Sequence, residues 1–99
     1  MPSSKPVKNQ FPVALKIVRR RLSIPQEAFG LLSSRTYVSS IERGLKAPTL
    51  SKIDELAEVL EIHPLTLLAL AYTPHQDLQA MDSLLDGVRK QAEAIFGRG

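Results

Sequence analysis

Apolar residues recur at three- and four-residue spacing along most of the chain, from Phe11 to Phe96. This spacing places them on one face of an α-helix, and no segment alternates with the two-residue period of a half-buried strand. The pattern predicts an all-α fold, in which a bundle of five helices is followed by a sixth, amphipathic C-terminal helix.

The first three helices are expected between positions 11 and 44. The first begins near Pro12 and stops about Ser23, and the residues on its inner face share 4, 3 and 4 spacing: Phe11, Leu15, Val18 and Leu22. A second helix begins after Pro25 and runs over residues 26–32. Ser33 and Ser34 supply the turn and the cap of a third helix over residues 35–43, which stops at Gly44.

The last three helices follow similar signals. The fourth begins after Pro48, with Thr49 or Ser51 as its cap, and carries apolar residues at helical spacing: Leu50, Ile53, Leu56, Ala57 and Leu60. The fifth starts at His63 and Pro64. The sixth, capped by Thr73, covers residues 74–96, roughly 35 Å if unbroken. Gly87, in its middle, indicates a kink or a close approach of another helix.

The pattern divides the chain into three parts. Residues 1–10 show no periodicity and hold two Lys and two Pro. They are expected to form a disordered basic arm, which is a solvated tail in the favoured interpretation and a minor-groove contact in the other. Residues 11–72 form the predicted core domain, and residues 73–99 form an appended oligomerisation helix.

Composition excludes several classes of chemistry. Ninety-nine residues that are 43 % hydrophobic suit a single small domain. The chain has no Cys, and its two histidines, His63 and His75, have no ligand-spaced acidic neighbours, so no metal and no cofactor is expected. There is no Gly-rich phosphate loop and no nucleophile elbow, which argues against an enzyme and leaves no catalytic residue to name.

The location of the protein is predicted from two absences. No apolar run approaches ~18 residues, so no membrane span is expected. The first ten residues lack the apolar region of a signal peptide. A cytoplasmic protein is the expectation.

Charge is divided unevenly between the two halves of the chain. Residues 1–46 carry nine Lys and Arg against two Glu, whereas residues 47–99 carry four against eight acidic residues. The overall charge of +3 therefore hides a basic N-terminal half that would face a polyanion. Double-stranded DNA is the expected partner.

A set of motifs carries a resemblance to a known family. Arg19 stands seven residues before Gln26, residues 36–44 read TYVSSIERG, a Pro-Thr pair opens the next helix and Pro64 opens an apolar one. Over residues 11–71 the chain resembles the Xre-type helix-turn-helix family, which contains Cro and the phage repressors. The resemblance implies a transcription regulator, either a repressor or an activator, that binds a two-fold DNA operator through the major groove as a homodimer or a higher oligomer.

The resemblance also implies roles for individual residues. In the family, the positions matching Arg35, Thr36 and Ser40 touch base edges, with Ser39 beside them. Those matching Gln26, Arg43 and Lys46 meet phosphates, and those matching Arg19 and Glu42 form a buried ion pair. Chemically, Arg35 can bind guanine O6 and N7 through two hydrogen bonds; the alternative is a phosphate contact only.

Three more residues near the recognition segment have two interpretations each. Tyr37 can contact a sugar or a phosphate, or it can be a half-buried ring between helices. Arg20 and Arg21 can contact phosphates, or they can belong to a solvated helix face.

The chain departs from the family pattern in two places. From Gln26 to Glu42 there are sixteen steps, where the family commonly has eighteen, which affects the angle of the recognition helix. Glu61 replaces the usual Gly between the fourth and fifth helices. A left-handed Glu would cost about 1 kcal/mol relative to Gly, so a differently built turn is expected.

The C-terminal helix carries an apolar stripe that a five-helix domain does not need for its core. It can fold back across the fourth and fifth helices or pair with a second copy, and the second interpretation is favoured. The predicted dimer interface contains the following residues: Leu78, Met81, Leu84, Leu85, Val88 and Phe96. An alternative function is an antitoxin-type regulator that also clamps a partner protein, such as a toxin, with this helix.

Overall fold

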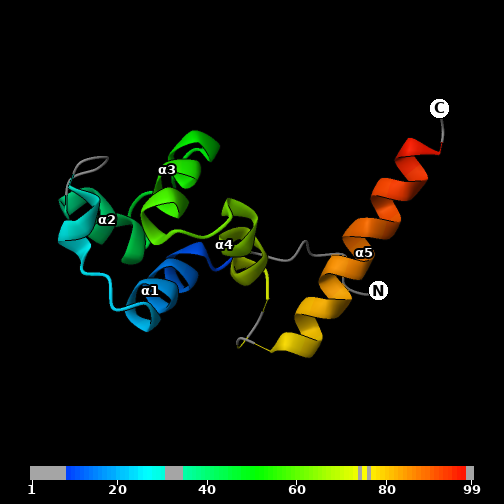
Figure 1. Ribbon diagram of the computed structural model, residues 1–99, viewed down its shortest axis with the longest axis horizontal. Coiled ribbons are helices and arrows are strands. Elements are labelled where there is room, and N and C mark those ends of the chain that lie inside the picture. Colours follow the sequence, from blue (N-terminus) through cyan, green and yellow to red (C-terminus); the bar gives the residue numbers. More distant parts are fainter. Residues whose placement is uncertain (1–8, 31–34, 74, 76, 98–99) are drawn as a thin grey trace.

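The computed structural model describes residues 9–30, 35–73, 75 and 77–97, and every regular element in these ranges is helical. The elements are α1 (Phe11–Arg21), the short 3₁₀ helix η1 (Gln26–Phe29), α2 (Arg35–Glu42), α3 (Leu50–Leu60), α4 (Pro64–Ala71) and α5 (Leu78–Phe96). The first four helices and η1 form a compact body, and α5 extends from it (Figure 1). The predicted all-α fold is confirmed. The predicted N-terminal arm lies almost entirely outside the described residues.

One apolar cluster forms the core of this body. Its members come from η1 and from each of the first four helices: Phe11, Ala14, Leu15, Val18, Phe29, Val38, Ile41, Ile53, Leu56, Ala57, Leu60, Leu67 and Ala71. Helix α1 packs chiefly against α4. The backbone N–H of Gln10, just before α1, donates to the carbonyl of Ala71 at 2.6 Å, which joins the start of the domain to the end of α4. Burial of these side chains is the main force that holds the short helices together.

Three helices end in the same type of turn, with one residue in the left-handed conformation. Ser23, Gly44 and Glu61 have φ values of 58°, 77° and 58°. In each case two backbone N–H groups turn back onto the last carbonyls of the helix, as in a Schellman motif. The expectation of a different turn at Glu61 is wrong. The Ile62 N–H reaches the Ala57 carbonyl at 3.1 Å, and this closure requires the left-handed residue between them.

Helix starts follow their capping side chains. Thr49 Oγ1 accepts the Lys52 N–H at 3.1 Å before α3, and His63 Nδ1 accepts the Leu65 N–H at 2.9 Å before α4. Helix α5 begins later than predicted, because Asp77 Oδ1 caps it at the Gln79 N–H. Thr73, the predicted cap, is buried and donates to the Ala69 carbonyl at the end of α4.

Three other expectations were wrong in detail. The second helix is a single 3₁₀ turn that ends at Phe29, rather than an α-helix to Leu32. Leu22 lies past the end of α1 and is 46 % exposed, so it does not extend the inner face. Leu50, at the first position of α3, is 72 % exposed, because the core lies one turn further along the helix.

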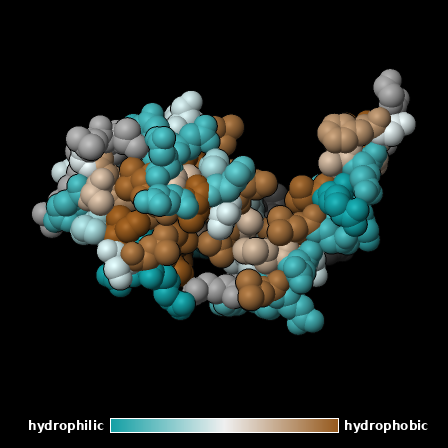
Figure 2. Space-filling model, viewed as in Figure 1, coloured by the Kyte–Doolittle hydropathy of each residue, from teal (hydrophilic) through white to brown (hydrophobic). Residues whose placement is uncertain are grey.

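Helix α5 has 19 residues and buries none of them fully. It contacts α4 near its start, and its far end stands clear of the body (Figure 1). Its apolar surface lies on the side that faces the body, with a hollow between them, and its other side is hydrophilic (Figure 2). The helix continues through Gly87, and a Cβ added there would meet no atom within 4 Å. The close approach predicted at Gly87 is therefore not made by another described part of the chain.

Candidate nucleic-acid interface

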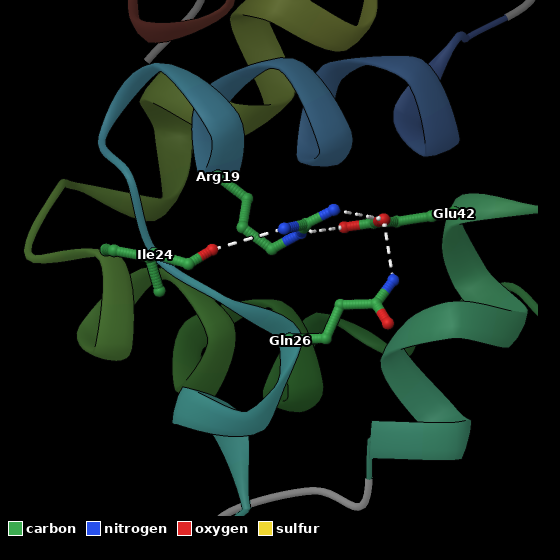
Figure 3. Close-up of polar contacts among 4 residues, drawn as sticks. All are labelled: Arg19, Ile24, Gln26 and Glu42. Carbon is green, nitrogen blue, oxygen red and sulfur yellow. Dashed lines mark hydrogen bonds and ion pairs between the residues drawn. The ribbon is translucent and has the colours of Figure 1, made fainter.

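A polar network joins α1, η1 and α2. Arg19 donates to Glu42 through Nε at 2.6 Å and through Nη2 at 2.9 Å (Figure 3). Its Nη1 donates to the Ile24 carbonyl at 3.2 Å, in the turn after α1. Gln26, the first residue of η1, donates from Nε2 to Glu42 Oε1 at 3.1 Å. Four backbone segments are thereby fixed around one carboxylate.

Burial makes this network a strong constraint on geometry. The Arg19 and Glu42 side chains are only 11 % and 4 % exposed. The hydrogen bond to Glu42 raises the pKa of the Arg19 guanidinium above its usual value, although burial works in the opposite direction. A buried charge that loses its partner is strongly destabilising. The orientation of α2 relative to α1 and η1 therefore depends on this pair.

The outer face of α2 is the part of the helix left free to meet a ligand. Thr36 and Arg43 are exposed and Ser39 is half-buried, whereas Val38 and Ile41 are fully buried beneath them. Helical spacing of three and four residues puts the three outer positions on one side. Arg35 begins α2, but its side chain lies outside the described part of the chain.

Ser40 does not belong to this outer face. It is only 7 % exposed. Its backbone takes part in the turn that ends α2, where the Leu45 N–H donates to the Ser40 carbonyl at 2.8 Å. A residue this deeply buried offers almost nothing to a base edge, so we do not retain the predicted base contact of Ser40.

The cationic side chains predicted to meet phosphates are on the surface. Arg20 and Arg21 are exposed at the end of α1, and Arg43 and Lys46 are exposed after α2. Helix α2 lies at the opposite end of the molecule from α5, along its longest axis (Figure 1). The basic surface and the exposed apolar helix are therefore separated in space as well as in sequence.

Tyr37 is half-buried and packs against the core, with two ammonium groups over its ring. Lys46 Nζ and Lys52 Nζ each lie 5.5 Å from the ring centroid. Lys52 was not among the predicted site residues, because it belongs to α3 and to the acidic half of the sequence. Its position in the first turn of α3, directly after the loop that carries Lys46, is the signal that could have indicated it. The two lysines and Tyr37 bring a cationic and aromatic surface next to α2, where Lys52 Nζ also pairs with Glu55 at 2.9 Å.

The shortened connection between η1 and α2 keeps the network intact. Gln26 and Glu42 are in hydrogen-bond contact even though the chain between them is two residues shorter than the family pattern. The single 3₁₀ turn of η1 is shorter than the predicted α-helix and uses fewer residues. Ser33 and Ser34, the predicted turn and cap, lie outside the described residues.

The described residues offer neither a metal site nor a membrane-spanning helix. Across the described ranges, no three His, Cys, Asp or Glu side chains are grouped so that they could hold a metal ion. No helix in the same ranges combines the length and the apolar character needed to cross a membrane.

Comparison with known protein families supports this geometry. A family model described as helix-turn-helix matches residues 15–67, more than half of the chain, and the matched range runs from α1 into α4. No curated protein and no solved structure matches the chain.

Proposed function

The chain belongs to the Xre/Cro-type helix-turn-helix family of DNA-binding regulators, a non-enzymatic class of domain, and we propose that it reads a two-fold operator as a homodimer. In this proposal α2 is the recognition helix, and it enters the major groove with its outer face toward the bases. Binding at the operator would regulate transcription of the neighbouring genes.

The observation that carries the proposal is the fixed orientation of a largely polar helix face. Thr36 and Ser39 are available on the outer side of α2, while the Arg19–Glu42 pair fixes the helix from behind. The Thr36 methyl group suits a thymine methyl, and a short Ser39 lets the helix approach the groove closely. Arg35 is the proposed guanine contact at the first position of the helix.

Phosphate contacts would position this helix without reading sequence. We assign that role to the exposed cations on both sides of α2, at the end of α1 and in the loop that follows α2: Arg20, Arg21, Arg43 and Lys46. The Tyr37 surface with Lys52 extends the same cationic region. Gln26 uses one amide N–H for Glu42, and an amide nitrogen carries two hydrogens, so one remains for a phosphate.

A dimer is proposed because one recognition helix reaches only a few base pairs. A genome offers about 10⁶ or more competing sites, and so short a sequence would occur too often to be selected. Two copies related by a two-fold axis would read two half-sites separated by about one helical turn, or a multiple of it.

The direct test is selection from a pool of duplexes with a randomised centre, using the full chain. Enrichment of a motif with two inverted half-sites is expected. Enrichment of a single short half-site would support DNA reading by a monomer. Recovery of no motif at all would count against sequence-specific binding.

A further inference from the structure

The apolar residues of α5 follow a coiled-coil pattern as well as a helical one. Six of them are spaced alternately by three and four residues and form a single seam: Leu78, Met81, Leu85, Val88, Ala92 and Ile95. In heptad terms, Leu78, Leu85 and Ala92 occupy position a, and the other three occupy position d. Such a seam is the kind of surface that packs against a second helix.

Four of the six seam residues are exposed. Leu78 is 74 % exposed, Leu85 42 %, Val88 53 % and Ile95 65 %. Met81 and Ala92 are the half-buried members of the seam. Met81 lies near the start of α5, where the helix contacts α4, and the half-buried Ala80 and Leu84 lie beside the seam. Contact with α4 therefore leaves most of the seam without a neighbour.

We infer that α5 pairs with α5 of a second copy in the antiparallel direction, about a two-fold axis between Asp86 and Gly87. In this register every seam residue has a partner: Leu78 faces the partner's Ile95, Met81 faces the partner's Ala92 and Leu85 faces the partner's Val88. Each layer joins an a position to a d position, which is the arrangement of an antiparallel pair. This inference names the interface of the homodimer suggested under Proposed function and rests on that proposal.

Charge complementarity decides the direction. The seam is flanked at position e by Asp82 and Arg89, both exposed, and Arg89 also pairs with Asp86 and Glu93 of its own helix. In the antiparallel register, Asp82 lies opposite the partner's Arg89, and the two-fold axis makes this pair twice. In a parallel pair, Asp77 would instead lie opposite the partner's Asp82, and like charges would repel. The antiparallel direction is therefore favoured.

A charge exchange tests the direction. Asp82→Arg and Arg89→Asp each place like charges opposite one another twice in an antiparallel dimer, and each should raise the dimer Kd about tenfold. An equimolar mixture of the two variants restores both attractive pairs, so native mass spectrometry should show mainly the mixed dimer. Lys90→Asp is the matched control. Position 90 is heptad position f, on the side of α5 away from the seam, so this change should leave the dimer Kd unchanged.

Cross-linking gives an independent readout of register. The chain has no Cys, so introduced thiols meet no background. A mixture of Leu78→Cys and Ile95→Cys should form a mixed disulfide under mild oxidation, while Leu78→Cys alone should not link to itself. Self-linking of Leu78→Cys, or tighter dimerisation of Asp82→Arg, would establish a parallel pair and overturn the inference.

Two further outcomes separate this inference from the proposed function. A full chain that stays monomeric at all concentrations would overturn the inference. DNA binding measured on the same samples decides the proposed function separately. Operator binding by a parallel dimer or by a monomer would reject the antiparallel seam and still support DNA recognition by α2.

Discussion

At the scale of single residues, two adjacent roles on α2 can be separated by experiment. Arg35, Thr36 and Ser39 are proposed to contact bases, whereas Arg43, just after the helix, is proposed to contact a phosphate. Base contacts distinguish one sequence from another, and phosphate contacts strengthen binding to all sequences alike. The two kinds of residue should therefore differ in specificity as well as in affinity.

Arg35→Ala should cost about 1–3 kcal/mol of binding free energy on the preferred duplex and relax the preference at one base pair. Arg43→Ala is the comparison: it should weaken all duplexes equally and reduce the slope of log affinity against log salt by about 1. Fluorescence anisotropy on duplexes with single base changes measures both effects. An unchanged base preference in Arg35→Ala would remove Arg35 from the set of reading residues.

Glu42→Ala should destabilise the fold by about 3–5 kcal/mol, because it leaves the Arg19 guanidinium buried without its carboxylate. Thermal or urea unfolding followed by circular dichroism measures the loss. The double change Arg19→Met with Glu42→Leu removes both charges and should recover much of the stability. A Glu42→Ala variant that melts like the parent chain but no longer binds DNA would mean that Glu42 acts at the DNA surface.

The sequence alone predicts the contacts of some of these residues but not the burial or the neighbours of others. The Arg19–Glu42 contact was expected from the spacing of family-like motifs, and the two side chains lie within hydrogen-bonding distance. The burial of Ser40 is not predicted by the motif, which marks a position along the helix and carries no information on its exposure. The position of Lys52 over Tyr37 depends in the same way on how α3 packs.

At the scale of elements, caps and turns explain most boundaries. The predicted positions of Thr49, His63 and Gly44 at helix ends agree with the structure. Thr49 and His63 cap a helix through a side-chain hydrogen bond, and Gly44 ends one in the left-handed conformation. These effects are local and depend on residue type, so the sequence predicts them. The later start of α5 was missed because Thr73 and Asp77 are both good capping residues. Only tertiary packing, which buries Thr73 against the end of α4, decides between them.

Glu61→Gly should stabilise the protein. Glu61 is in the left-handed region at φ 58°, where glycine is tolerated without steric cost. We expect a gain of about 0.5–1 kcal/mol after allowance for the greater freedom of glycine in the unfolded chain. The melting temperature should rise by a few degrees, on the order of 2–8 °C.

Glu58→Gly is the matched control for this change. It makes the same replacement three residues earlier, at an exposed position inside α3, and should destabilise by about 1 kcal/mol. If Glu61→Gly lowers the melting temperature as Glu58→Gly does, the glutamate side chain contributes more to stability than its backbone strain costs.

At the scale of the whole molecule, the proposed DNA-binding surface around α2 and the proposed dimer seam on α5 lie at opposite ends of the molecule (Figure 1). The core cluster lies entirely between residues 11 and 71, and α5 contributes no fully buried side chain. The basic N-terminal half contains η1 and α2, and the acidic half contains α5. Acidic surface at the far end is kept away from phosphates when α2 faces DNA.

Removal of residues 75–99 should leave a folded domain that no longer dimerises. The truncated chain keeps the whole core cluster and should unfold cooperatively, but it lacks the seam of α5. It should bind the operator far more weakly, because only one half-site can be held at a time. Light scattering and circular dichroism of the two chains test this. A truncated chain that still forms the full dimer would place the interface on α1–α4.

The central claim, that the outer face of α2 reads a DNA sequence while cations around it hold phosphates, is tested most directly by one titration series. The full chain is titrated against the selected duplex and against a scrambled duplex of the same composition, each at several salt concentrations. We predict that the selected duplex binds at least about 10³-fold more tightly. Log affinity should fall steeply with log salt for both duplexes, by about 0.9 for each phosphate neutralised. Equal affinity for the two duplexes, or a slope near zero, would contradict the account.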